Sequence, residues 1–184
     1  MGNSISYLSI REVNKYQDLL YLSAKEIKKA SIQFMNIYNE LNLKDIKFTN
    51  IFEASIPIKD FTQNCPEICV NPFRHRLCQL FHKQTSMMKF EDYLDILSIF
   101  SNESPTEIKI YYVFKLYDFD EDSAIGCEDL LSVIHMMMGT EDTKQFDKNK
   151  LINKLFKEAD IDENGTISYT EFQNIVMKMS NFTK

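Results

Sequence analysis

Apolar residues recur along most of this chain at the three- and four-residue spacing of amphipathic helices. Two capping boxes, Ser9 with Glu12 and Ser23 with Glu26, mark the first helix starts. Apolar stripes of helical spacing cover residues 27–41, 73–81, 90–100, 110–117, 130–137, 151–156 and 172–179. Since the 184 residues include only four Gly and four Pro, the pattern predicts an all-α fold.

Two further helix starts are indicated by a polar residue followed by proline. Asn71 precedes Pro72, and Ser104 precedes Pro105. A proline suits the first turn of a helix because the N–H that it lacks would have no intrahelical acceptor there. We therefore expect Asn71 and Ser104 to cap two helices.

The second half of the chain repeats a helix, an acidic loop and a helix. The first residues of the two loops, Asp118 and Asp160, lie 42 residues apart. A single unit of this kind cannot bury its apolar face, so such units pair. Ile125 and Ile167 take the eighth position of their loops, and we expect them to face each other in a short antiparallel strand pair.

The loop of residues 160–171, DIDENGTISYTE, matches a calcium-loop pattern at every fixed position. Gly165 lies at the sixth position, where the backbone must turn sharply, and a glutamate closes the loop with two carboxylate oxygens. A hard dication needs about six to eight oxygen ligands, which this spacing supplies from one short segment. The candidate ligands are Asp160, Asp162, Asn164, the backbone carbonyl of Thr166, and Glu171.

The loop of residues 118–129, DFDEDSAIGCED, follows the same pattern with two departures. Ser123 replaces the sixth-position glycine, so a residue with a Cβ must take the left-handed turn, at a cost of about 1 kcal/mol. Asp129 replaces the closing glutamate, and its shorter arm favours Mg²⁺ or weak Ca²⁺ binding. A degenerate loop that binds no metal is the alternative. The candidate ligands are Asp118, Asp120, Asp122, the backbone carbonyl of Ala124, and Asp129.

The first half of the chain is predicted to contain two similar units that have lost their ligands. Ile56 and Met88 are the candidates for the eighth loop position, which places the loops near residues 49–60 and 81–92. Because these loops offer few oxygen ligands, we expect structural helix–loop–helix units without metal. The element boundaries between residues 42 and 70 stay open at this point.

Acidic residues are concentrated in the second half. Residues 1–100 carry 12 basic and 11 acidic side chains, whereas residues 101–184 carry 9 basic and 16 acidic ones. Clustered like charges repel one another unless a cation neutralises them, and an acidic surface argues against nucleic-acid binding. The three histidines show no ligand or triad spacing, so no enzymatic activity is predicted.

The N-terminus combines a lipidation motif with the absence of a secretory signal. No stretch approaches about 18 consecutive apolar residues, and the first residues lack a secretory apolar core. We therefore expect a cytoplasmic protein with reduced cysteines. Gly2 and Ser6 fit the motif M-G-x-x-x-[ST], so Gly2 is a candidate for myristoylation and for reversible peripheral membrane contact.

Methionines gather near the two acidic loops. Flexible thioethers suit a groove that accepts more than one helix, although an ordinary core position is the alternative for any single methionine. The groove predicted for a partner helix is formed by Phe114, Ile134, Met137, Phe172, Ile175, Val176 and Met179.

Four helix–loop–helix units, with metal ligands only in the last two, resemble calcium and integrin-binding proteins. Asp129 at the end of the third loop is similar to that family, whereas Ser123 departs from it. Calcineurin B is similar in its N-terminus and its NP-containing helix, but it keeps carboxylates in its first two loops. The resemblance is carried by YQDLLYLSAKEI (16–27), NPFRHRLCQLF (71–81), FEDYLDILSIFS (90–101), YDFDEDSAIGCEDL (117–130) and ADIDENGTISYTEF (159–172).

The resemblance implies four EF-hand units in two lobes, with an N-terminal extension at residues 1–22, an N-lobe at 23–101 and a C-lobe at 102–184. It implies a regulatory protein that binds Ca²⁺ and Mg²⁺ and is expected to be monomeric. Its partner would be an amphipathic helix from the cytoplasmic tail of a membrane protein such as an integrin. The alternatives are a non-catalytic, calcineurin B-like subunit of a phosphatase or kinase, and a passive Ca²⁺ buffer.

Overall fold

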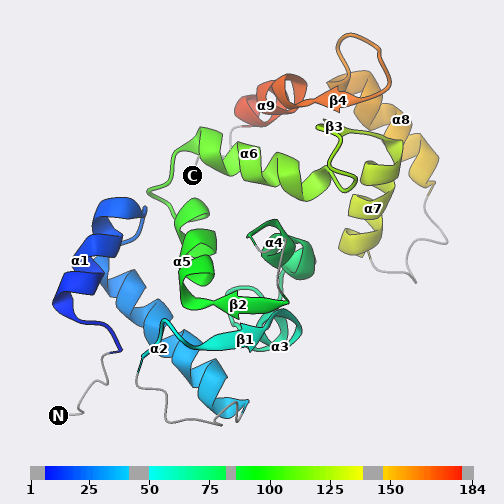
Figure 1. The fold of residues 1–184 in the computed structure, drawn as a ribbon. Helices are drawn as coiled ribbons and strands as arrows, with labels where there is room; N and C mark the ends of the chain where they lie inside the picture. Colours follow the sequence, from blue (N-terminus) through cyan, green and yellow to red (C-terminus); the bar gives the residue numbers. More distant parts are fainter. Residues whose placement is uncertain (1–6, 42–49, 82–85, 139–146, 180–184) are drawn as a thin grey trace. The chain divides into compact units, whose positions relative to one another are not determined.

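The computed structural model describes residues 7–41, 50–81, 86–138 and 147–179 (Figure 1). Within these residues the protein is mostly helical, with two short antiparallel strand pairs, as the sequence predicts. The chain forms two compact units, Met1–Ser104 and Pro105–Lys184, called here the N-terminal and C-terminal units. None of the helices in the described ranges has the length and apolar character needed to cross a membrane.

The N-terminal unit consists of helices around one strand pair. Both predicted capping boxes are present, since the Ser9 and Ser23 hydroxyls accept hydrogen bonds from the amides of Glu12 and Glu26. The elements are α1 (Ile10–Leu19), α2 (Ala24–Glu40), β1 (Ser55–Pro57), α3 (Ile58–Asn64), α4 (Arg74–Phe81), β2 (Met87–Lys89) and α5 (Phe90–Ile99).

The core of the N-terminal unit joins an aromatic cluster to the strand pair. Ile56 of β1 lies opposite Met88 of β2, which confirms the pairing predicted from the eighth loop positions. Phe61 and Tyr93 are both fully buried, with ring centroids 5.1 Å apart in an edge-to-face arrangement. Phe34 of α2 lies against both rings, so α2, α3 and α5 share one core.

The C-terminal unit repeats this plan. Ile125 pairs with Ile167, which confirms the predicted antiparallel contact between the two acidic loops (Figure 1). Phe114, Ile134 and Ile152 bury their side chains around this pair. The elements are α6 (Thr106–Tyr117), β3 (Ala124–Ile125), α7 (Cys127–Met138), α8 (Lys148–Ala159), β4 (Ile167–Ser168) and α9 (Tyr169–Lys178).

The two helix starts predicted from proline are wrong in detail. The Asn71 side chain accepts the amide of Phe73 at 2.8 Å in a local turn, but α4 begins only at Arg74. Helix α6 begins at Thr106 with Pro105 in the capping position and no side-chain cap. Asn71 therefore stabilises a turn before α4, and the carbonyl of Pro105, which accepts the amides of Ile108 and Lys109, makes the proline itself the capping residue of α6.

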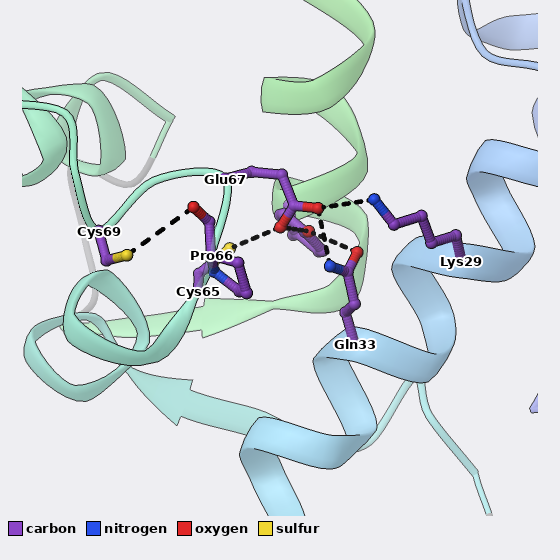
Figure 2. A network of polar contacts seen from close by, with 7 residues as sticks. Lys29, Gln33, Cys65, Pro66, Glu67 and Cys69 are labelled. Atoms are coloured by element: carbon purple, nitrogen blue, oxygen red, sulfur yellow. Dashed lines mark hydrogen bonds and ion pairs between the residues drawn. The ribbon is translucent and has the colours of Figure 1, made fainter.

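A polar network ties α2 to the segment after α3 and to α5 (Figure 2). One oxygen of Glu67 accepts hydrogen bonds from Lys29 at 3.1 Å and from Gln33 at 2.7 Å, and the other accepts the Tyr93 hydroxyl at 3.3 Å. Burial raises the pKa of Glu67, but the hydrogen bonds from Gln33 and Lys29 lower it by more, so its pKa lies below the ordinary value. The ionised carboxylate therefore suits this position.

All four cysteines are free thiols. Burial raises the pKa of Cys65 to about 11 and that of Cys78 to about 12, because desolvation disfavours the thiolate. Cys69 is half-buried, whereas Cys127 at the start of α7 is exposed. The four thiols therefore differ in their access to solvent.

Candidate metal centre

The loop of residues 160–171 begins where α8 ends. The Asp160 amide still donates to Phe156, so the first ligand candidate is fixed by the last helical turn. Gly165 has φ +84°, the left-handed conformation that the sequence predicts at the sixth position. The turn at Gly165 reverses the chain direction, and β4 and then α9 follow it.

Hydrogen bonds from the loop's own backbone orient its side chains. The two carboxylate oxygens of Asp160 accept the amides of Asn164 at 3.0 Å and Gly165 at 2.8 Å. Asp162 also accepts the Asn164 amide, and the side-chain oxygen of Asn164 accepts the amide of Thr166 at 2.8 Å. The oxygen ligands are therefore held in place by the loop that carries them.

Glu171 joins the start of this loop to the start of α9. One of its oxygens accepts the Ile161 amide at 2.7 Å, and the other accepts the Ser168 amide at 2.9 Å and hydroxyl at 2.7 Å. Hydrogen bonds from Ser168, followed by that from Ile161, lower the pKa of Glu171 to about 2. The buried side chain is therefore ionised, which is the form in which a carboxylate can bind a metal ion.

The chemistry of this donor set fits a hard divalent cation. Oxygens of Asp160, Asp162 and Glu171 all lie within 4.8 Å of one another. Three carboxylates at this range repel one another, and a cation among them removes that repulsion. An amide oxygen from Asn164 and the carbonyl of Thr166 are available in the same loop, and such all-oxygen sets suit Ca²⁺.

The loop of residues 118–129 has the same backbone course despite its sequence departures. Ser123 has φ +75°, so a residue with a Cβ does take the left-handed turn that glycine takes in the other loop. The Asp129 oxygens accept the amides of Phe119 and Gly126, each at 2.8 Å. These are the bonds that Glu171 makes with Ile161 and Ser168, so Asp129 fills the corresponding structural position.

The donor group of this second loop is smaller. Oxygens of Asp118, Asp120 and Asp122 lie within 4.8 Å of one another, but this group does not include Asp129. The Asp129 side chain is one carbon shorter than that of glutamate, and both of its oxygens accept backbone amides. In addition, the ammonium of Lys115 lies 2.8 Å from the buried Asp118 carboxylate. Within the described ranges, both donor groups of this kind belong to the C-terminal unit.

Sequence reasoning missed two side chains at these loops. The hydroxyl of Ser168, at the ninth loop position, accepts the Glu171 amide as the cap of α9 and donates to the Glu171 carboxylate; the S-x-x-E spacing was the available signal. Lys115 is part of no recognised motif. The available signal was its position three residues before Asp118, because residues at this spacing lie close together on a helix.

The residues predicted to form the partner groove fall into two groups. Phe114, Ile134 and Val176 are buried, and Phe172 and Ile175 pack against the same core. Met137 of α7 and Met179 after α9 are exposed, as are Met136 and Met177. The predicted groove residues are therefore divided between exposed methionines at α7 and α9 and side chains that belong to the core. The candidate lipidation site Gly2 lies outside the described residues.

The chain is similar to known proteins over nearly its whole length. A family model described as an EF-hand domain pair matches residues 107–177, which contain both acidic loops. Calcium and integrin-binding family member 2 of Drosophila melanogaster is 32% identical over 99% of this chain and 96% of the relative. The protein of the same name in Danio rerio is 30% identical, and calcium and integrin-binding family member 3 of Homo sapiens is 29% identical, both with the same coverage.

Proposed function

The chain belongs to the calcium and integrin-binding family, and on that premise we propose that it is a regulatory protein in which Ca²⁺ binding controls the docking of a partner helix. The observation that carries the proposal is the convergence of Asp160, Asp162 and Glu171 oxygens within 4.8 Å of one another. The ligand set proposed for this loop is completed by Asn164 and the carbonyl of Thr166.

In this proposal, Glu171 couples metal binding in the 160–171 loop to the position of α9. Its two oxygens bond to Ile161 at the start of the loop and to Ser168 at the start of α9. A bound Ca²⁺ supplies positive charge that offsets the loop carboxylates. Any adjustment of the Glu171 carboxylate toward the loop centre changes its bonds to Ser168 and thus the position of α9 against the core.

The loop of residues 118–129 is proposed as a weaker site that accepts Mg²⁺ or Ca²⁺. Its three grouped carboxylates, Asp118, Asp120 and Asp122, suit a hard cation, and the carbonyl of Ala124 is the fourth proposed ligand. Asp129 is the proposed closing ligand, but it already holds two backbone amides. A lower coordination number favours the smaller ion.

The docking surface is proposed on α7 and α9. Met136 and Met137 are exposed on α7, and Met177 is exposed on α9 with Met179 just after it. Movement of α9 would add Phe172, Ile175 and Val176 to the apolar surface, which suits one face of an amphipathic helix. The relatives' names mention integrin binding, which supports an integrin as the source, and we propose that its cytoplasmic tail supplies the helix.

The proposal also covers the location, the oligomeric state and the lipidation of the protein. The protein is proposed to act as a cytoplasmic, non-catalytic monomer. Myristoylation of Gly2 would add reversible contact with a membrane, since a single acyl chain binds membranes only marginally. An intact-mass measurement of protein from native cells tests the modification.

Glu171→Gln tests the metal site. It removes one charged ligand, so the Ca²⁺ dissociation constant of this loop is expected to rise from about 10⁻⁷–10⁻⁵ M to about 10⁻⁴–10⁻³ M in isothermal calorimetry. Glu163→Gln is the matched control, because Glu163 is an exposed residue of the same loop outside the grouped oxygens. Equal Ca²⁺ uptake by both variants and the wild type would contradict the assignment.

The same samples separate the proposal from the passive-buffer alternative. A regulatory protein exposes apolar surface on Ca²⁺ binding, so an environment-sensitive hydrophobic dye should brighten with the wild type and with Glu163→Gln, but not with Glu171→Gln. A buffer binds Ca²⁺ without a dye response. Copurification of a catalytic chain from native cells would favour the phosphatase- or kinase-subunit alternative.

A further inference from the structure

Lys115 forms an ion pair with the first ligand candidate of the weaker loop. Its ammonium nitrogen lies 2.8 Å from Oδ2 of Asp118. The Asp118 side chain is fully buried and that of Lys115 is 24% exposed, so the pair is largely shielded from water. An ion pair in such surroundings is screened less than one at the surface.

The other loop offers a natural comparison. Lys157 stands three residues before Asp160, just as Lys115 stands three residues before Asp118. Lys157 is exposed, and among the described residues no ion pair joins it to Asp160. The Asp160 carboxylate instead accepts two backbone amides, which leave its negative charge available to a cation.

We propose that Lys115 acts as a built-in competitor for the cation at the 118–129 loop, and that it keeps the metal affinity of this loop below that of the 160–171 loop. The inference rests on the proposed metal-binding function and adds a residue that sets the order in which the two loops fill. The ammonium and a divalent cation both require the negative charge of Asp118. When the cation binds, Lys115 must either leave the carboxylate or stay and repel the ion.

The competition separates two measurable quantities. In the absence of metal, Lys115 stabilises the buried carboxylate of Asp118, so its removal should lower the stability of the protein. In the presence of metal, its removal should raise the affinity of the loop. A residue with a purely structural role would change the first quantity without improving the second.

The experiment uses the full chain with Glu171→Gln, in which only the 118–129 loop retains its full ligand set. Lys115→Met in this background is expected to raise Ca²⁺ and Mg²⁺ affinity about 3- to 10-fold in calorimetry, since a methionine keeps the apolar stem but not the charge. Lys157→Met is the matched control and should leave the affinity of the 118–129 loop within about twofold, because it lies outside that loop.

Lys115→Arg provides a second arm that keeps the charge. It should retain the affinity of the parent, and Lys115→Met should lower the melting temperature in EDTA relative to the parent. Unchanged or weakened metal binding by a folded Lys115→Met protein would overturn the inference. Failure of the wild-type 160–171 loop to bind Ca²⁺ would instead overturn the proposed function, so the two failures are distinguishable.

Discussion

Glu171 connects the candidate metal loop of residues 160–171 to α9 through the hydrogen bonds of one carboxylate. The amide and hydroxyl of Ser168 and the amide of Ile161 surround its oxygens. These donors stabilise the ionised form and bring its pKa to about 2. Because the folded pKa lies below the ordinary glutamate value of 4.5, ionised Glu171 adds stability above about pH 4.5, and this stability is lost as pH falls toward 2.

Ser168→Ala tests this coupling at the level of one hydroxyl. In metal-free protein the variant should raise the pKa of Glu171 toward its ordinary value, because the largest stabilising hydrogen bond is gone. The measurement is an NMR titration of the Glu171 carboxyl carbon in EDTA. Thr170→Ala, at an exposed neighbouring position, should leave the pKa unchanged. A pKa that stays near 2 in Ser168→Ala would show that other donors hold the charge.

The strand pairs are the elements that unite each pair of loops. Ile125 and Ile167 are both buried and lie opposite each other, so the two acidic loops are joined by one antiparallel strand pair. Ile56 and Met88 do the same in the N-terminal unit. A change in the backbone conformation of one loop should therefore alter its strand pairing with the other loop.

Ile167→Ala tests the energetic weight of this pairing. Loss of a buried isoleucine side chain should lower the free energy of unfolding by about 2–5 kcal/mol, because a cavity is left in the core. Urea unfolding followed by circular dichroism measures the change. Ile161→Ala is the control from the same loop: Ile161 is 66% exposed, so the change should stay within about 0.5 kcal/mol. Similar losses in both variants would refute the role of burial.

The strand pairs also show which elements could be predicted from sequence. The eighth loop position is fixed by a local pattern, so it led to the correct partners even in the two degenerate loops. The starts of α4 and α6 were missed because Asn71 and Ser104 meet the local rule for a cap, but Asn71 stabilises a separate turn and Pro105 takes the capping position of α6. Local signals determine pairing better here than they determine helix ends.

At the scale of the whole molecule, charge is divided unevenly between the two units. The acidic excess lies in residues 101–184, where both grouped donor sets occur among the described residues. The Glu67 network of the N-terminal unit brings together residues that lie far apart in the sequence. No sequence motif predicts these contacts. The two acidic loops could be recognised from the sequence because their candidate ligands lie within twelve residues, whereas a long-range network requires the fold.

Saturating Ca²⁺ should therefore stabilise the two units unequally. At a free Ca²⁺ concentration about 100 times the dissociation constant, one site adds about 2.7 kcal/mol to the stability of the unit that contains it. Hydrogen exchange should slow most at amides of α8 and α9, and much less in α2 and α5. Glu171→Gln should reduce this difference. Equal protection of both units by Ca²⁺ would contradict a metal response centred on the C-terminal unit.

The unequal exposure of the four cysteines has a practical consequence for such measurements. Cys127 is exposed and occupies the tenth position of the 118–129 loop, whereas the buried Cys65 and Cys78 have raised pKa values. Alkylating reagents require an accessible thiol, so we expect the unmodified sequence to react most readily at the exposed Cys127. A fluorophore attached there would report from beside Asp129 on the filling of the weaker site, without any engineered anchor.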